Sequence, residues 1–289
     1  RSGSRPRRAL QGARREGARL EEVSGAQQAT SAPHIPVFLI VGGPPLHAGY
    51  IRRLFRAEAA GKLTFGKIVV IDRDPLCAAA SLASSRVELD VADWREALPR
   101  RLARANPGDH LVPYHWAPHV LLDWLADHLG QHGLRLVREP LLSQAESAPS
   151  PTSPGAGAVG GRDPRSRPRD PDGLPVSPPV SLVTGAGDVA LSYADFICPP
   201  ACIEPALCPH TRGPRSWSLS TELGRADDSY VFPCAHLTFG VATIEVAALL
   251  RVRDRVVARR QQPGRNPRDP FWLSTASHCH GLAARVTLT

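Results

Sequence analysis

Three cysteines and a histidine crowd into one proline-rich stretch, Cys198–His210 (CPPACIEPALCPH). Thiolates together with imidazole are ligands that suit zinc or an iron–sulfur cluster. Proline fixes φ and donates no backbone hydrogen bond, so this stretch can form neither a helix interior nor a central strand. We therefore predict a stiff loop that presents Cys198, Cys202, Cys208 and His210 to a metal.

The loop supplies three thiolates, and the fourth ligand is expected to be His210 or a residue from one of two later groups. Cys234 and His236 stand two residues apart in segment 230–239, which is typical of one strand, and strand alternation would put both on the same face. The other group is Cys279 with its flanking histidines. If Cys234 were the fourth ligand, the set would be all cysteine, which favours an iron–sulfur cluster. Glu204 inside the loop is interpreted as an exposed side chain or an acid/base residue.

The spacing of this motif, C-x3-C-x5-C-x-H, is not that of a standard zinc finger or ferredoxin. Three small buried hydrophobes or a redox pair therefore stay open as alternatives to a metal site.

The elements that position these residues follow from hydrophobic periodicity. In the first half we predict strands and helices in alternation, with strands at 36–41, 67–71, 86–90, 110–114 and 134–137 and helices at 50–60, 94–105 and 120–129. Such alternation indicates βαβ units. In the second half we predict strands at 180–183, 189–193, 230–239, 271–281 and 282–288 and a helix at 241–259. The predicted fold class is α/β: a Rossmann-like parallel sheet with helices on both faces, followed by a cysteine-rich α/β second half.

Polar features gather where the predicted parallel strands end. They are Gly42 and Gly43 after the first strand, Asp72 after the second, Asp90 after the third and His115 after the fourth. Ligands of open α/β sheets bind in the crevice beyond the carboxyl ends of the strands. These five residues are therefore the predicted cofactor-binding set.

Part of this half resembles a known family. Val37–Pro44, Ile68–Pro75 (IVVIDRDP) and Leu89–Leu98 (LDVADWREAL) resemble the nucleotide-binding Rossmann domain of potassium-transport regulators of the TrkA type. Leu111–Leu122 is also similar to the corresponding strand–loop–helix of saccharopine-dehydrogenase-like proteins. The resemblance covers residues 36–138 and implies NAD(P) binding. It implies that Asp72 holds the adenosine ribose and that Asp90 lies near the adenine.

The phosphate fingerprint G-x-G-x-x-G of such domains is absent, because Gly42 and Gly43 are followed by Pro44 and Pro45. Two prolines remove backbone N–H donors where a pyrophosphate would need them. A mononucleotide, a differently held dinucleotide and no nucleotide at all therefore remain open.

Composition divides the chain into four parts. Residues 1–33 are expected to be a disordered tail, 34–142 the Rossmann-like nucleotide-binding domain, 143–180 a Ser/Pro/Gly/Arg-rich linker or insertion and 181–289 the cysteine- and histidine-rich half. The net charge is +8, yet the arginine-rich stretches 1–33 and 251–268 account for more than all of it. No aromatic–basic interleaving accompanies them, which argues against nucleic acid as a partner.

The remaining predictions concern the location of the protein in the cell, its partners and its function. No apolar run is long enough for a membrane span, and six cysteines in 289 residues do not form a secreted disulfide scaffold. We expect a cytoplasmic protein without membrane insertion and with a small-molecule nucleotide as its partner. The sequence does not determine the oligomeric state, and a homo-oligomer is one of the alternatives. The predicted function is an NAD(P)-binding oxidoreductase with a cysteine-ligated metal or cluster. The alternatives are a non-catalytic nucleotide sensor and a metal-binding protein on a degenerate Rossmann scaffold.

Overall fold

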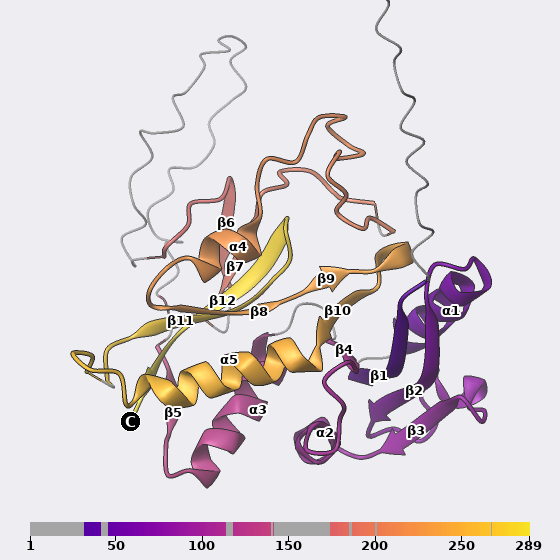
Figure 1. Ribbon diagram of the computed structural model, residues 1–289, viewed down its shortest axis with the longest axis horizontal. Helices are drawn as coiled ribbons and strands as arrows, with labels where there is room; N and C mark the ends of the chain where they lie inside the picture. Colours follow the sequence, from indigo (N-terminus) through magenta and orange to yellow (C-terminus); the bar gives the residue numbers. More distant parts are fainter. Residues whose placement is uncertain are drawn as a thin grey trace, which may run out of the picture. The chain divides into compact units, whose positions relative to one another are not determined.

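The computed structural model (Figure 1) describes residues 32–41, 46–113, 118–139, 141, 174–184, 187–199, 201–266 and 268–289. Gly42, Gly43 and His115 of the predicted nucleotide site lie outside the described residues, as does the expected tail up to Ser31. Residues from Ala32 to Thr289 belong to one compact unit. Within it, helices accompany two mixed sheets, which confirms the predicted α/β class.

The first sheet has the strand order β3-β2-β1-β4-β10-β9. Its strands β1 (His34–Val41), β2 (Thr64–Asp72), β3 (Val87–Val91) and β4 (His110–Val112) are parallel, as predicted. The other two, β10 (Ala242–Glu245) and β9 (Ala235–His236), come from the second half of the chain and run antiparallel to their neighbours.

Helices cover both faces of this sheet. On one face, α1 (Leu46–Ala59) packs Ile51 and Leu54 against Phe38 and Ile68. On the other face, α2 (Trp94–Leu102), α3 (Pro118–Gln131) and α5 (Val246–Arg259) share a core with the opposite set of strand residues. Asp93 caps α2, its Oδ1 accepting a hydrogen bond from the backbone N–H of Arg95 at 2.9 Å.

The second sheet has the order β6-β7-β12-β11-β8, with β5 also paired to β12. Only β8 and β11 are parallel in it. Its strands are β5 (Leu136–Arg138), β6 (Val180–Val183), β7 (Val189–Ser192), β8 (Ser229–Pro233), β11 (Phe271–Ala276) and β12 (His280–Leu288). One face shares the core of α3 and α5, and the other packs on α4 (Leu219–Gly224) through Leu219 and Leu223.

Several segments differ from the predictions. Segment 271–281 is not one strand, because β11 ends at Ala276 and residues 277–279 form the turn before β12. Segment 241–259 is not one helix, because residues 242–245 form β10 before α5 begins. Segment 230–239 is not one strand: β8 ends at Pro233 on the outer edge of the second sheet, and β9 follows in the other sheet before a 3-10 turn at Thr238–Gly240. The fifth predicted strand, β5, joins the second sheet and not the first.

No helix in the described residues is both long enough and apolar enough to cross a bilayer.

Candidate metal centre

The cysteine loop connects β7 to α4. Two residues in it, Glu204 and Arg212, adopt left-handed backbone conformations with φ of 50° and 55°. A short bridge between Leu207 and Pro214 closes a tight turn, in which the backbone N–H of Cys208 donates to the carbonyl of Gly213 at 2.9 Å. The predicted irregular conformation of the loop is therefore confirmed in the part of it that the structure describes.

Four of the six cysteines line one small cavity of about 10 Å³. Cys198, Cys202 and Cys208 come from the loop, and Cys279 comes from the turn between β11 and β12. Phe196, Trp217 and the predicted ligand His210 complete the aromatic part of the lining. The His210 ring stacks on Phe196, with centroids 3.7 Å apart and planes 9° from parallel.

Protonation of these thiols depends on where each one lies. Burial raises the pKa of Cys198, and burial raises the pKa of Cys279 to about 12. Hydrogen bonds from Thr211 instead lower the pKa of the more accessible Cys208. Without a cation, Cys198 and Cys279 are therefore neutral thiols at pH 7, so binding a metal would release their protons.

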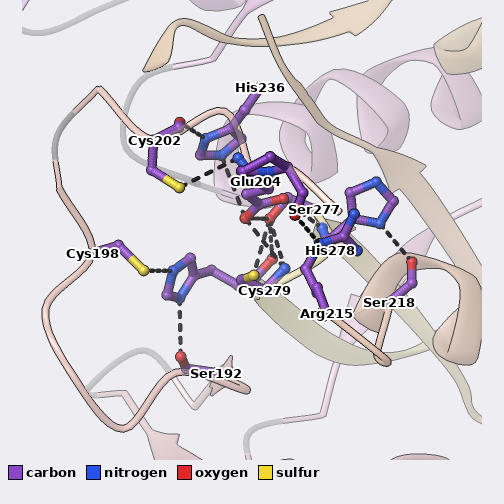
Figure 2. A network of polar contacts seen from close by, with 12 residues as sticks. Ser192, Cys198, Cys202, Glu204, Arg215, Ser218, His236, Ser277, His278 and Cys279 are labelled. Carbon is purple, nitrogen blue, oxygen red and sulfur yellow. Dashed lines mark hydrogen bonds and ion pairs between the residues drawn. The ribbon is translucent and has the colours of Figure 1, made fainter. Parts of the chain in front are cut away.

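Glu204 fixes the loop to the β11–β12 turn, as Figure 2 shows. Its carboxylate is buried and accepts hydrogen bonds from Ser277 Oγ at 2.6 Å and from the backbone N–H groups of His278 and Cys279 at 2.8 and 3.2 Å. Its own backbone N–H donates to Cys202 Sγ at 3.3 Å. The expectation of an exposed side chain is wrong, because three donors of the turn converge on this carboxylate.

Two imidazoles next to the cavity are held by their Nδ1 atoms. His236 Nδ1 lies 3.1 Å from the carbonyl oxygen of Cys202, which can only accept, so this nitrogen carries a proton. The hydroxyl of Ser192 donates to the carbonyl of Ala194 at 2.7 Å and lies 3.0 Å from His280 Nδ1, so it accepts from that nitrogen. Burial lowers the pKa of His280, which favours its neutral form.

In the neutral ring, the proton on Nδ1 leaves Nε2 as the acceptor. His280 Nε2 lies 3.4 Å from Cys198 Sγ, and His236 Nε2 lies 3.9 Å from Glu204 Oε1. This is how proteins orient metal-ligating histidines, through a hydrogen bond on the other ring nitrogen. In neutral His280 this acceptor is the ring nitrogen that lies next to the Cys198 thiol.

A second, larger cavity of about 280 Å³ adjoins the first. It shares Cys198, Cys202 and Glu204 with the thiol cavity and adds His236 and His280. Its remaining lining includes Tyr50 and Arg53, which α1 contributes from the first sheet. The cysteine loop thus lines both a small cavity that contains four thiols and a larger cleft with room for a small molecule.

Of the predicted metal ligands, Cys234 does not line the thiol cavity. It follows Pro233 at the break between β8 and β9, and its backbone N–H donates to the carbonyl of Ala276 at 2.8 Å. Its side chain packs in the core of α3 and α5, and burial raises its pKa. Cys279 lines the cavity where Cys234 was expected, and the sequence feature that pointed to Cys279 was the cysteine- and histidine-rich run Ser277–His280.

The predicted nucleotide residues that the structure describes lie on opposite faces of the first sheet. Asp90 is paired with Ile71 and forms ion pairs with Arg100 and Arg101 of α2, at 2.9 and 2.6 Å. Asp72, the next residue of β2, lies on the α1 face, where its buried carboxylate is 3.4 Å from His47 Nδ1. Neither carboxylate projects freely into a crevice, and nucleotide binding stays a prediction.

Comparison with known proteins adds one finding. Residues 161–289 match a protein family described as "Uncharacterized protein, C-terminal domain". The match includes the cysteine loop and the β11–β12 turn, and it covers less than half of the chain. No curated protein and no solved structure shows significant similarity to the chain.

Proposed function

We propose that the protein holds an iron–sulfur cluster on Cys198, Cys202, Cys208 and Cys279 and acts as an oxidoreductase on a small molecule bound in the adjoining cleft. The observation that carries this proposal is the convergence of four thiols on one cavity from two separate segments of the chain. Four cysteines are the ligand set of both [2Fe–2S] and [4Fe–4S] clusters.

The spacing of the sulfurs favours a cluster over a single zinc ion. Around one tetrahedral zinc with Zn–S near 2.3 Å, neighbouring sulfurs lie about 3.8 Å apart. Among the described residues, no three of these four sulfurs lie within 4.8 Å of one another. Cluster thiolates bind different iron atoms, so they stand further apart than the ligands of one ion. Because the cavity itself is small, loading a cluster requires the loop to open around the thiols.

The adjoining cleft supports the second part of the proposal. Arg53 supplies a permanent positive charge to it, and His236 and His280 line it together with Glu204. A small anionic molecule bound there would lie next to Cys198 and Cys202, which line both cavities. Electrons could then pass between the cluster and that molecule without crossing the protein core.

The test is metal and sulfide analysis of the full chain purified without oxygen. We expect iron and acid-labile sulfide in equal amounts, with a visible chromophore that dithionite bleaches. Cys279→Ser should lose most of both, while the matched control Cys234→Ser, which removes a buried thiol outside the cavity, should keep them. Zinc without sulfide, or loss in the control alone, would overturn the proposal; circular dichroism establishes that each variant is folded.

A nucleotide-sensing role is the second candidate, and one observation favours it. The parallel strands of the first sheet follow the order β3-β2-β1-β4, which dinucleotide-binding folds also use. Calorimetric titration of the full chain with NAD⁺, NADH and NADP⁺ tests this role. Absence of heat for all three would reject it without affecting the cluster proposal.

A further inference from the structure

We propose a second metal site, independent of the cysteine loop, in which His47, Asp72 and Cys77 hold one zinc-type divalent ion. One ligand atom from each of these three residues lies within 4.8 Å of the other two, and this is the one such group of three or more among the described residues. All three residues are buried, with 0%, 8% and 4% of their surface exposed. The proposal rests on these residues alone and does not depend on the proposed function.

Local backbone geometry after β2 brings Asp72 and Cys77 together. Asp72 Oδ1 accepts a hydrogen bond from the backbone N–H of Asp74 at 3.0 Å. The carbonyl of Asp74 then accepts from the backbone N–H of Cys77 at 3.1 Å, which closes a turn. His47 arrives from the first turn of α1, which packs on the same face of the sheet. The ligands therefore come from two elements that the core already fixes.

The distance between two of the ligand atoms matches tetrahedral coordination. His47 Nδ1 and Asp72 Oδ2 lie 3.4 Å apart. Two ligands bound tetrahedrally to one zinc, each at roughly 2.1 Å, would be about 3.4 Å apart. The Asp72 Oδ2 atom is buried and accepts no hydrogen bond from any described residue, whereas Oδ1 is already occupied. A buried carboxylate oxygen of this kind is costly unless a cation compensates it.

Charge balance supports a divalent ion. A carboxylate, a thiolate and a neutral imidazole together carry two negative charges, so a divalent cation makes the buried site electrically neutral. The mixed nitrogen, oxygen and sulfur set suits zinc and cobalt, while magnesium and calcium prefer oxygen ligands alone. Three protein ligands are also the number used by catalytic zinc sites, which keep a fourth position for water or substrate.

The place of the cluster in the fold points the same way. Asp72 is the last residue of β2, and His47 lies in the first turn of the helix that follows β1. The three residues thus lie at the carboxyl ends of parallel strands, where open α/β sheets bind their ligands. Asp72 was predicted to hold a ribose, and we assign it a metal instead.

A buried ion pair between protonated His47 and Asp72, with Cys77 merely packed beside it, is the competing explanation. It requires no metal and predicts no thiolate at this site. The two explanations therefore differ in bound zinc and in the ligands around it.

The experiment loads the full chain with zinc after chelation and measures stoichiometry and X-ray absorption. We expect a tightly bound zinc with a single sulfur ligand and the rest nitrogen or oxygen. Zinc with four sulfur ligands would place the ion in the cysteine cavity, and absence of tight zinc would support the ion pair; either result overturns the proposal. Iron and sulfide content are measured in the same samples, so failure of the cluster proposal remains distinguishable.

Variants localise the ion. Asp72→Asn keeps the side-chain shape and the acceptor for Asp74, and it should weaken zinc affinity by at least about 100-fold, since loss of groups that only orient a ligand already costs 10–100-fold. Cys77→Ser should do the same and should also remove the thiolate-to-cobalt absorption of the cobalt-loaded protein. Cys234→Ser is the matched control and should change neither. Unchanged zinc affinity in Asp72→Asn would refute the site even if Cys77→Ser failed to fold.

Discussion

Replacing Glu204 by glutamine should loosen the attachment of the cysteine loop to the β11–β12 turn. In the wild type, Oε1 accepts from Ser277 and Cys279, and Oε2 accepts from the backbone N–H of His278 at 2.8 Å. Glutamine keeps one acceptor oxygen but places an NH₂ group against at least one of these donors. The variant loses a charge-assisted hydrogen bond and leaves a buried N–H unsatisfied.

The expected cost follows from these contacts. A hydrogen bond to a charged group contributes about 1.5–3 kcal/mol, and an unsatisfied buried donor costs about 1–3 kcal/mol. Because the two descriptions overlap, we expect Glu204→Gln to lower the free energy of unfolding by about 2–4 kcal/mol. Domains of ordinary stability have about 5–15 kcal/mol in total, so a loss of this size is easily measured.

Urea denaturation followed by circular dichroism measures this loss, with Asp254→Asn as the control. Asp254 has 62% of its side chain exposed and pairs only with the adjacent Arg253, so this change should cost less than about 0.5 kcal/mol. Alkylation of Cys198 and Cys202 should be faster in Glu204→Gln than in either reference protein. A loss below about 0.5 kcal/mol with unchanged alkylation would refute the role of the carboxylate.

The backbone at Glu204 allows a second comparison. Its φ of 50° is a conformation that residues with a Cβ adopt at a cost of about 1–2 kcal/mol and glycine adopts freely. Glu204→Ala and Glu204→Gly both lose the carboxylate, but the glycine variant should be about 1 kcal/mol more stable. The reverse order would mean that the loop has a different backbone conformation.

Three further outcomes are expected. Burial lowers the pKa of His110 from its ordinary value of 6.5, so below about pH 6.5 the unfolded chain binds a proton more readily than the folded chain. The free energy of unfolding should therefore fall as the pH drops below about 6.5. His110→Gln should flatten that part of a plot of melting temperature against pH. A Cβ at Gly281 would lie 2.8 Å from the Cβ of Ala276, so Gly281→Ala should cost about 1–3 kcal/mol in urea denaturation. Gly130→Ala in α3, where a Cβ meets nothing within 4 Å, should instead raise stability by about 0.5–1 kcal/mol; equal effects at the two glycines would contradict the packing described.

The parallel part of the first sheet could be predicted because each strand is a short apolar run followed by a turn signal. Residues 38–41 and 68–71 are buried on both faces, as such runs require. β10 could not be predicted in this way, because no glycine or proline separates 242–245 from the helix after it. Its strand conformation is set by pairing with β4, a partner more than a hundred residues earlier in the chain.

The site shows the same division between local and distant causes. Prolines made the loop conformation of Cys198–His210 predictable, because their effect on the backbone is local. The choice of Cys279 over Cys234 depends on the break between β8 and β9, because the chain there places the Cys234 side chain in the core of α3 and α5 and not in the cavity. Burial of Glu204 depends on donors in the Ser277–Cys279 turn, and no local pattern around residue 204 announces them.

The exchange of strands between the halves has a consequence for biosynthesis. His110 of β4 hydrogen-bonds through its side chain to Thr243 of β10, 133 residues later, at 2.9 Å. A nascent chain therefore carries an open sheet edge at β4 while everything up to residue 241 is being translated, and exposed edges invite pairing with other chains. This topology therefore predicts that a chaperone protects the edge of β4 during translation, or that folding is completed slowly after β10 has been translated.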